Sequence, residues 1–288
     1  METPTPEDSH NSLPISQLLN TTFTIHKTTP VVGSLPGFDN AACHKYLLSL
    51  RRRILPFIEL LPNNNDDPPS AAGAWTARQF HRRGMTIHSI SFPSCKFVLL
   101  VRLVSTTTSQ HERERELVVF TRASRQLHDV FITWLEMYFD IIVRSVKLST
   151  TFILQFIEDH VLACHRNQAT TGVRLDFTTG VSQLKTITLA FEPDDVVKFV
   201  ALLPPDDDDD DRRGAGVLAR MLDHMENTTG LKFAKIDLAR AACNGGVIGA
   251  DGRIKYILAN PDAASSNWRT TFVETWVDKI AGLVWNAE

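Results

Sequence analysis

Three residues near the middle of the chain, His160, Cys164 and His165, have the side chains of a partial metal site. His160 and Cys164 are four residues apart, so on a helix they share one face and supply half of a tetrahedral zinc site. A complete site needs a second pair of ligands, and no other pair in the sequence has that spacing. We therefore interpret Cys164 as a buried thiol beside two imidazoles on a helix surface, and expect neither a metal nor a cofactor.

The sequence also lacks the motifs of common catalytic sites: a G-x-S-x-G elbow, a P-loop and a G-x-G-x-x-G after a strand. The segment 245–249 is rich in glycine, but it leads into a predicted hairpin and not into a helix N-terminus that would hold phosphate. Asp176 and Asp237 alternate with apolar residues in predicted strands, so we expect both carboxylates to face solvent or a partner. No two acids are paired for general acid–base catalysis. We therefore expect that the protein is not an enzyme. An enzyme whose site has no recognisable motif is the weakest of the hypotheses.

Charge is unevenly distributed along this chain of 288 residues. The net charge is −3, and one run of six acids, Asp206–Asp211, accounts for the negative sign. The basic residues form two clusters, Arg51, Arg52 and Arg53 in one and Arg78, Arg82 and Arg83 in the other. Such clusters could neutralise phosphates without reading sequence, so these six arginines are candidates for DNA contact. An ordinary charged surface explains them equally well.

Cysteine usage indicates a reducing compartment. The four cysteines are scattered and form no C-x-x-C pair, which is typical of nuclear or cytosolic proteins with free, buried thiols. No apolar run approaches the ~20 residues that span a bilayer, so we expect no membrane association. Residues 1–19 are polar and contain proline, and we interpret them as a disordered lead-in rather than a signal peptide.

The first half of the chain alternates between strand and helix patterns. The segment Asn20–Pro30 is a predicted half-buried edge strand, with Phe23 and Ile25 alternating against threonines and Pro30 ending the ladder. A helix is predicted from Asp39, with the Arg51–Arg53 triplet in its last turn, where cations suit the dipole. After a solvent loop at 62–73, further strands are predicted within 85–92, 96–104 and 117–120, followed by an amphipathic helix capped by Ser124.

The second half repeats this style. Strands are predicted at 141–146, 173–177, 184–191, 231–238 and 253–258, and helices at 150–164, from Pro193, at 217–228 and at the C-terminus, with a solvent loop at 204–214. Gly230 is a predicted left-handed helix stop. The fold class is therefore α+β, a mainly antiparallel, twisted β-sheet with helices packed on it. We expect a single domain over 20–288, divisible into lobes at 20–146 and 147–288.

Four segments, in order, resemble the centromere protein L (CENP-L) family. They are "NTTFTIHKTTPVV" at 20–32, "LHDVFITWLEMYFDIIVRSVKLS" at 127–149, "LKTITLAFEPDDVVKFV" at 184–200, and the closing pair "TTGLKFAKIDLARA" and "DGRIKYIL". The insertions at 62–69 and 206–211 depart from the animal pattern and are more similar to the fungal branch. The family fold implied is a single CENP-L-like domain.

The resemblance implies a non-enzymatic subunit of the inner kinetochore in the nucleus, within the constitutive centromere-associated network. Family members pair with a CENP-N-like partner, largely through C-terminal β-structure, and the pair helps to bind centromeric nucleosomes and DNA. Carried onto this sequence, the pairing surface is 231–238 and 253–258, and its candidate residues are Leu231, Phe233, Lys235, Asp237, Arg253, Lys255 and Ile257. Two alternatives stay open: a self-associating scaffold that uses the same edge, or an internal strand of the protein's own sheet.

Overall fold

Antiparallel strands that are apolar on at least one face form the framework of the chain. The computed structural model describes residues 18, 20–32, 41–59, 76–82, 85–92, 95–104, 114–179, 186–203, 216–257 and 267–286. The expected loops at 62–73 and 204–214 lie outside these ranges, as does the expected lead-in at 1–19 except for Leu18, which is buried, and Asn20 begins the next described stretch.

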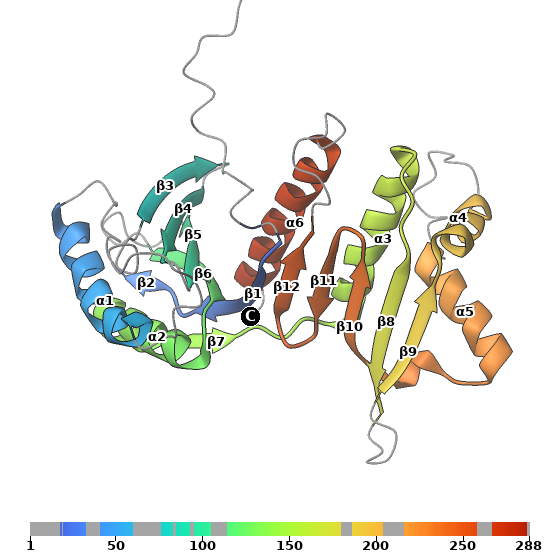
Figure 1. The fold of residues 1–288 in the computed structure, drawn as a ribbon, viewed down its shortest axis with the longest axis horizontal. Helices are drawn as coiled ribbons and strands as arrows, with labels where there is room; N and C mark the ends of the chain where they lie inside the picture. Colours follow the sequence, from blue (N-terminus) through green and yellow to red (C-terminus); the bar gives the residue numbers. More distant parts are fainter. Residues whose placement is uncertain are drawn as a thin grey trace, which may run out of the picture. The chain divides into compact units, whose positions relative to one another are not determined.

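The chain divides into two compact units (Figure 1). Unit 1 consists of residues 1–14, 23–146 and 280–288, and unit 2 of residues 15–22 and 147–279. The C-terminal helix is therefore shared, because its last residues are assigned to unit 1.

The sheet of unit 1 runs in the order β3–β4–β5–β6–β1, and every neighbouring pair is antiparallel. The short strand β2 pairs with β6, and β7 pairs with β1. The strands are β1 (Thr22–Thr28), β2 (Val31–Val32), β3 (Thr76–Arg82), β4 (Met85–Ser91), β5 (Lys96–Val104), β6 (Glu114–Arg122) and β7 (Val143–Ser145).

Strand β1 has neighbours on both sides, so the expectation of an edge strand is wrong. The strand ends before Pro30, and Phe23 and Ile25 are buried, both as expected. One edge pairs with β6, and the other edge pairs with β7 at residues 26–28. The chain that leaves β7 continues this contact, since the Val146 N–H donates to the Ile25 carbonyl at 3.0 Å. A partner strand only three residues long, as β7 is, gives too little periodicity to be paired from sequence.

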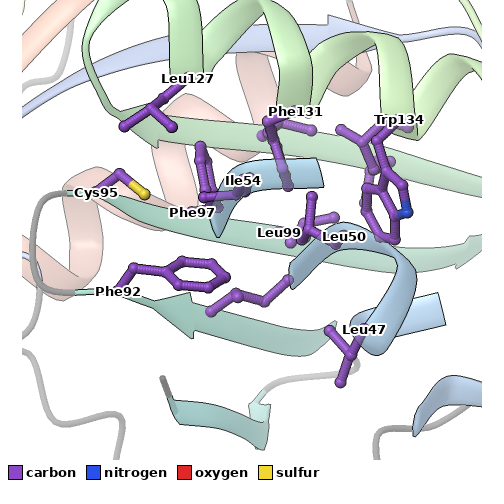
Figure 2. Packing of buried hydrophobic residues seen from close by; sticks show 14 of the residues in the cluster. Leu47, Leu50, Ile54, Phe92, Cys95, Phe97, Leu99, Leu127, Phe131 and Trp134 are labelled. Carbon is purple, nitrogen blue, oxygen red and sulfur yellow. The ribbon is translucent and has the colours of Figure 1, made fainter. Parts of the chain in front are cut away.

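Two helices cover one face of the unit 1 sheet, α1 (Ala41–Glu59) and α2 (Arg125–Phe139). Ser124 caps α2 as expected, because its hydroxyl accepts the Leu127 N–H at 3.5 Å. Figure 2 shows the core beneath them, where aliphatic side chains of α1, aromatic side chains of α2 and the strands interleave. The rings of Phe97 and Phe131 stack with centroids 3.8 Å apart. Burial of these apolar faces stabilises the unit.

The arginine triplet lies inside α1 and not in its last turn, because the helix continues to Glu59 through Pro56. A proline inside a helix removes one backbone hydrogen bond and ordinarily marks an end or a kink. Here Ile54 is fully buried and Phe57 packs against the same core, so tertiary contacts offset that cost. The prediction ended this helix too early because it weighed the charge of the arginines above the apolar residues beyond them.

The sheet of unit 2 runs in the order β12–β11–β10–β8–β9, again with antiparallel neighbours. The strands are β8 (Val173–Thr178), β9 (Thr186–Phe191), β10 (Asp237–Cys243), β11 (Gly246–Gly249) and β12 (Arg253–Tyr256). The turn between β11 and β12 contains the Asp251-Gly252 pair, where Gly252 has φ 78°, as a hairpin predicts.

Helix α3 (Thr150–Arg166) packs on β10 and β11, and α4 (Pro193–Ala201) and α5 (Val217–Thr229) pack against α3 (Figure 1). The Glu158 carboxylate of α3 accepts the first N–H groups of α5, from Val217 and Leu218, at 2.6 and 3.0 Å. Gly230 ends α5 at φ 73°, as expected. Helix α6 (Asn267–Trp285) adds Trp276, whose ring lies edge-on to Phe156 with centroids 5.0 Å apart.

The α+β fold class with antiparallel pairing is confirmed. Within the described residues, no helix has both the length and the apolar composition that a bilayer crossing requires.

Candidate interaction surface

One face of the unit 2 sheet carries polar and small side chains. Strand side chains alternate between faces, and Leu175 and Phe177 of β8 point to the buried side under the helices. Arg174 and Thr178 alternate with them and are exposed. No helix among the described residues covers this second face, which we call the open face, while Figure 1 shows α3 on the other side of the strands.

Two rows of side chains cross the open face. In the first row, Arg174 lies opposite Ala190 on one neighbour and Ala242 on the other, and Val247 lies opposite Lys255. A second row beside it consists of Thr188, Asp176 and Arg240, from β9, β8 and β10 respectively. Long basic side chains therefore share the open face with alanine and valine side chains.

A β-bulge brings Arg240 into this row. The register between β10 and β8 shifts between Leu238 and Arg240, so Ala239 takes the extra position. Without the shift, strict alternation from buried Leu238 would turn Arg240 toward the core. The turn between β11 and β12 holds the bulge in place, since the Ala250 N–H donates to the Ala239 carbonyl at 2.9 Å.

Asp176 is the centre of a hydrogen-bonded network on the open face. Its Oδ1 accepts from Arg174 Nε at 3.0 Å and from the Thr188 hydroxyl at 2.8 Å. Its Oδ2 accepts from Arg240 Nε and Nη2 at 3.0 and 2.8 Å. The Asp176 side chain is only 10% exposed, whereas the two arginine side chains are about half exposed. Asp176 lies on the face opposite the apolar residues, as expected, but its side chain is covered by its neighbours and not open to solvent; contact with a partner stays a prediction.

The charged form of Asp176 is favoured. Burial alone would raise the pKa of this carboxyl, but the hydrogen bonds from Thr188, Arg174 and Arg240 outweigh burial and lower it below its ordinary value. The carboxylate thus fixes the orientation of two guanidinium groups. Neither arginine has a further hydrogen bond to another described residue, so the remaining N–H groups are free to contact carboxylates or phosphates of a partner.

The first of the two predicted pairing segments does not have the predicted conformation. Residues 231–238 do not form a strand: 233–235 are a 3-10 helix, and β10 begins only at Asp237. The Glu226 carboxylate accepts the Phe233 N–H at 2.8 Å and pairs with Lys232, which holds the chain in a turn. The alternation of apolar residues that predicted one strand therefore spans two different elements, this turn and the start of β10.

The seven predicted partner residues therefore fall into two groups. Phe233 is buried, with its ring 5.2 Å from that of Phe177, and so belongs to the core. The others are exposed or half-buried. Of these, Lys255 lies on the open face, and Arg253, two positions earlier on β12, lies on the same face in an ion pair with Asp251 at 3.3 Å. The rest are Leu231, Lys235, Asp237 and Ile257.

The free edge of the sheet is at β9, which the sequence reasoning did not consider. On β12, the side away from β11 is occupied at one point, since the Asn20 N–H donates to the Tyr256 carbonyl at 2.7 Å. Strand β9 pairs only with β8 among the described residues, and Thr186–Phe191 contains no charged residue and no proline. Such an edge lacks the usual protection against pairing with another strand.

The six arginines proposed for DNA contact are only partly placed. Arg52 is exposed and Arg51 and Arg53 are half-buried on α1. Arg78 and Arg82 lie in β3, a strand that the prediction missed because its sequence is largely polar; the structure gives no position for their side chains. Arg83 lies outside the described residues.

His160 and Cys164 lie together in the interior of unit 2, with Nε2 3.3 Å from Sγ, and His165 is exposed. The expectation of a surface imidazole at His160 is therefore wrong, because the aromatic ring of Phe272 packs over it with centroids 5.0 Å apart. Burial, and secondarily Arg269, lower the pKa of His160 to about 4. No group of three or more potential ligands occurs among the described residues.

The described cysteines behave as buried thiols. Cys95, Cys164 and Cys243 are free and buried, as expected, and burial raises the pKa of each thiol, to about 12, 11 and 12. The side chain of Cys43 lies outside the described residues.

A second buried histidine lies in unit 1, and sequence reasoning missed it. His26 Nε2 is 3.1 Å from both Thr121 Oγ1 and His128 Nε2, and His128 Nδ1 is 3.1 Å from Asp129. Burial, and then His128, lower the pKa of His26 to about 4. The Thr121 hydroxyl lies 3.5 Å from the Thr24 carbonyl, to which it donates, so this chain of polar groups ties β1 to β6 and α2.

Comparison with known proteins gives one result for most of the chain. Residues 82–285 match the family described as CENP-L, centromere protein L. No curated protein matches the chain significantly.

Proposed function

The chain belongs to the centromere protein L family, and from this premise we propose that it pairs with a CENP-N-like protein to help hold centromeric nucleosomes. Family membership itself gives the chain a structural role at the kinetochore, in chromosome segregation, in association with other kinetochore subunits and at the centromere in the nucleus. The family is not one of enzymes. The heterodimer and the binding of nucleosomal DNA are the finer proposals.

The observation that best supports a binding role is the open face with its Asp176 network. Two arginines from different strands are held by one buried carboxylate, and their outer N–H groups have no described partner. Charge-assisted bonds of this kind give both affinity and orientation to a contact. We propose that Leu231, Lys235, Asp237, Arg253, Lys255 and Ile257 contribute to partner binding at and beside this face. Phe233 contributes only as core.

The heterodimer is tested by mixing the purified protein with a CENP-N-like protein and measuring mass by light scattering after size exclusion. We expect one-to-one complexes, weakened at least about tenfold by Arg253→Glu with Lys255→Glu. Thr133→Glu, an exposed position of α2 in unit 1, serves as the control. A C-terminal deletion is a poor test because Ile254, Tyr256 and Trp276 are core residues. Full affinity in the double variant would remove these residues from the pairing surface.

The DNA proposal rests on charge alone. Replacing Arg51, Arg52, Arg78, Arg82 and Arg83 by Glu is expected to weaken binding of the complex to duplex DNA and to reduce the slope of affinity against salt. Arg53 is left unchanged here, since its guanidinium contacts two side chains of α2. An unchanged salt slope would leave these arginines as ordinary surface charge.

The self-associating scaffold remains the second candidate, favoured by the uncharged edge of β9. In that case the isolated protein forms a dimer whose mass falls on dilution, and Thr188→Pro, which blocks strand addition at this edge, gives a monomer. Because Thr188 also donates to Asp176, Ile187→Lys, which adds a charge at the same edge, is the second variant. A monomer at all concentrations would exclude the scaffold.

A further inference from the structure

Exposed apolar side chains are concentrated at the end of α2. Of the six large hydrophobic residues that are exposed in the described part of the chain, three lie within six positions. They are Met137 at 63% exposure, Tyr138 at 38% and Ile142 at 53%. Single exposed hydrophobic residues need no explanation, but a contiguous group next to polar residues marks a contact surface.

Side chains of α1 extend this group into a patch on unit 1. Ser49 Oγ and Tyr138 Oη are 2.6 Å apart, and the rings of Tyr46 and Tyr138 meet edge-on with centroids 5.4 Å apart. Arg53 donates to Met137 Sδ at 3.6 Å, and its guanidinium carbon lies 5.9 Å from the Tyr138 ring centroid. We name Tyr46, Arg53, Met137, Tyr138 and Ile142 the α1–α2 patch.

The patch is ordered by its own contacts. The Glu136 carboxylate accepts the Val143 N–H at 3.1 Å, and the Ile142 N–H donates to the Thr29 hydroxyl at 3.0 Å, so the segment that carries Ile142 is fixed at both sides. Asp140 turns the chain in the left-handed region at φ 51°. A rigid group of Tyr, Met and Arg side chains has the composition of a binding hot spot.

The charges that α1 brings beside the patch are basic, while the end of α2 adds two acids: Glu136, whose carboxylate accepts the Val143 N–H, and exposed Asp140. Helix α1 carries Lys45, Arg51, Arg52 and Arg53, and Glu59, at its end, is its single acid. None of these four cations forms an ion pair with a side chain that the structure describes. A partner that covers the apolar residues therefore meets a basic border along α1, where cations outnumber acids, and electrostatic complementarity at that border favours acidic groups.

We infer that the α1–α2 patch binds an acidic segment of a partner protein, with apolar anchors that cover Met137, Tyr138 and Ile142 and carboxylates that meet Arg53 and the cations of α1. The surface lies in unit 1 and has no residue in common with the open face of unit 2, so the inference goes beyond the proposed pairing. An apolar anchor explains the exposed methionine and isoleucine, which phosphate binding does not.

The probe is a fluorescein-labelled amphipathic peptide with Leu and Phe on one face and Glu on the other, titrated with the full chain and followed by anisotropy. We expect peptide binding that weakens with salt. The double variant Met137→Glu, Ile142→Glu and the single variant Arg53→Glu should each bind the peptide at least about tenfold more weakly than the wild type. Arg125→Glu, a charge reversal at the far end of α2, is the matched control and keeps wild-type affinity. A peptide with Gln in place of Glu binds several-fold more weakly.

Three results would overturn the inference. The first is equal affinity of the patch variants and the wild type. The second is competition by duplex DNA: the DNA displaces the peptide, and the same variants weaken DNA binding. The patch would then be a nucleic-acid site. The third is a concentration-dependent dimer that the Met137→Glu, Ile142→Glu variant abolishes, because a second copy of the chain would then be the occupant. Circular dichroism of each variant shows whether it has folded.

Discussion

At the scale of single residues, Asp176 combines burial with four hydrogen bonds from three side chains. A buried carboxylate is costly when it is unpaired, and this one is satisfied by two cations that themselves remain half exposed. The network therefore stabilises the sheet and presents guanidinium groups on its surface. Sequence reasoning placed Asp176 correctly on the face away from the core residues, but could not find its partners, which lie on two other strands.

The first prediction concerns the charge of Asp176. Replacing Asp176 by Asn leaves Arg174 and Arg240 without their counter-charge, and we expect a loss of about 1–3 kcal/mol in the free energy of unfolding. Thr188→Val removes one neutral donor and is expected to cost roughly 0.5–1.5 kcal/mol. Urea unfolding at pH 7 measures both values. Equal stability of Asp176→Asn and the wild type would mean that the network adds nothing to the fold.

The second prediction concerns pH and rests on His160. The pKa of this buried imidazole is lowered from 6.5 to about 4. The unfolded chain therefore takes up a proton below pH 6.5 while the folded chain does not, so the free energy of unfolding falls from pH 6.5 to about 4, by up to roughly 3 kcal/mol for one such group. His26, with the same lowered pKa, contributes in the same direction.

The variants His160→Leu and His165→Leu test this assignment. Loss of His160 is expected to reduce the slope of stability against pH between 4.5 and 6.5 to about half, because His26 still contributes. His165 is exposed, so His165→Leu keeps the wild-type slope. The measurement is the urea midpoint at several pH values. The assignment fails if the two variants have the same slope.

At the scale of elements, periodicity and capping residues predicted most helices and strands. Three features depend instead on contacts that these local patterns do not reveal. Strand β3 was missed because its sequence lacks apolar alternation and is set by its full pairing with β4. Residues 231–238 were assigned to a strand, although Glu226 caps a turn there. The bulge at Ala239 depends on the hairpin that holds its carbonyl, a contact that no local pattern reveals. Side chains from distant elements decide such positions.

The third prediction concerns the contact between α3 and the β10–β11 turn. A Cβ added at Gly245 would overlap the His160 ring, so Gly245→Ala is expected to destabilise the protein by about 1–3 kcal/mol. Gly282 in α6 has nothing within 4 Å of a built Cβ, and Gly282→Ala is expected to stabilise by about 0.5–1 kcal/mol through helix propensity. Thermal unfolding separates the two. A neutral Gly245→Ala would show that the His160 ring moves aside easily.

At the scale of the whole molecule, the sequence resemblance predicted the family, and the match over residues 82–285 confirms it. The site was harder to predict. The resemblance indicated C-terminal β-structure, and the residues nominated there include exposed Arg253 and half-buried Lys255 but also buried Phe233. The arginines of the open face and the α1–α2 patch were not found, because each is assembled from two or more elements. Surfaces are properties of the fold, and local patterns give only their components.

The last prediction is that the two surfaces act independently. Arg174→Ala with Lys255→Ala changes the open face while Arg240 and Thr188 still pair with Asp176, so the fold is kept. We expect this variant to lose at least about tenfold in affinity for a CENP-N-like protein and to bind the acidic peptide normally. Met137→Glu with Ile142→Glu has the opposite pattern. The combined variant should show each loss unchanged for its own ligand, because residues without shared partners act additively. Affinities of all four proteins for both ligands measure this, and a patch variant that also weakens the CENP-N-like complex would mean that one partner covers both surfaces.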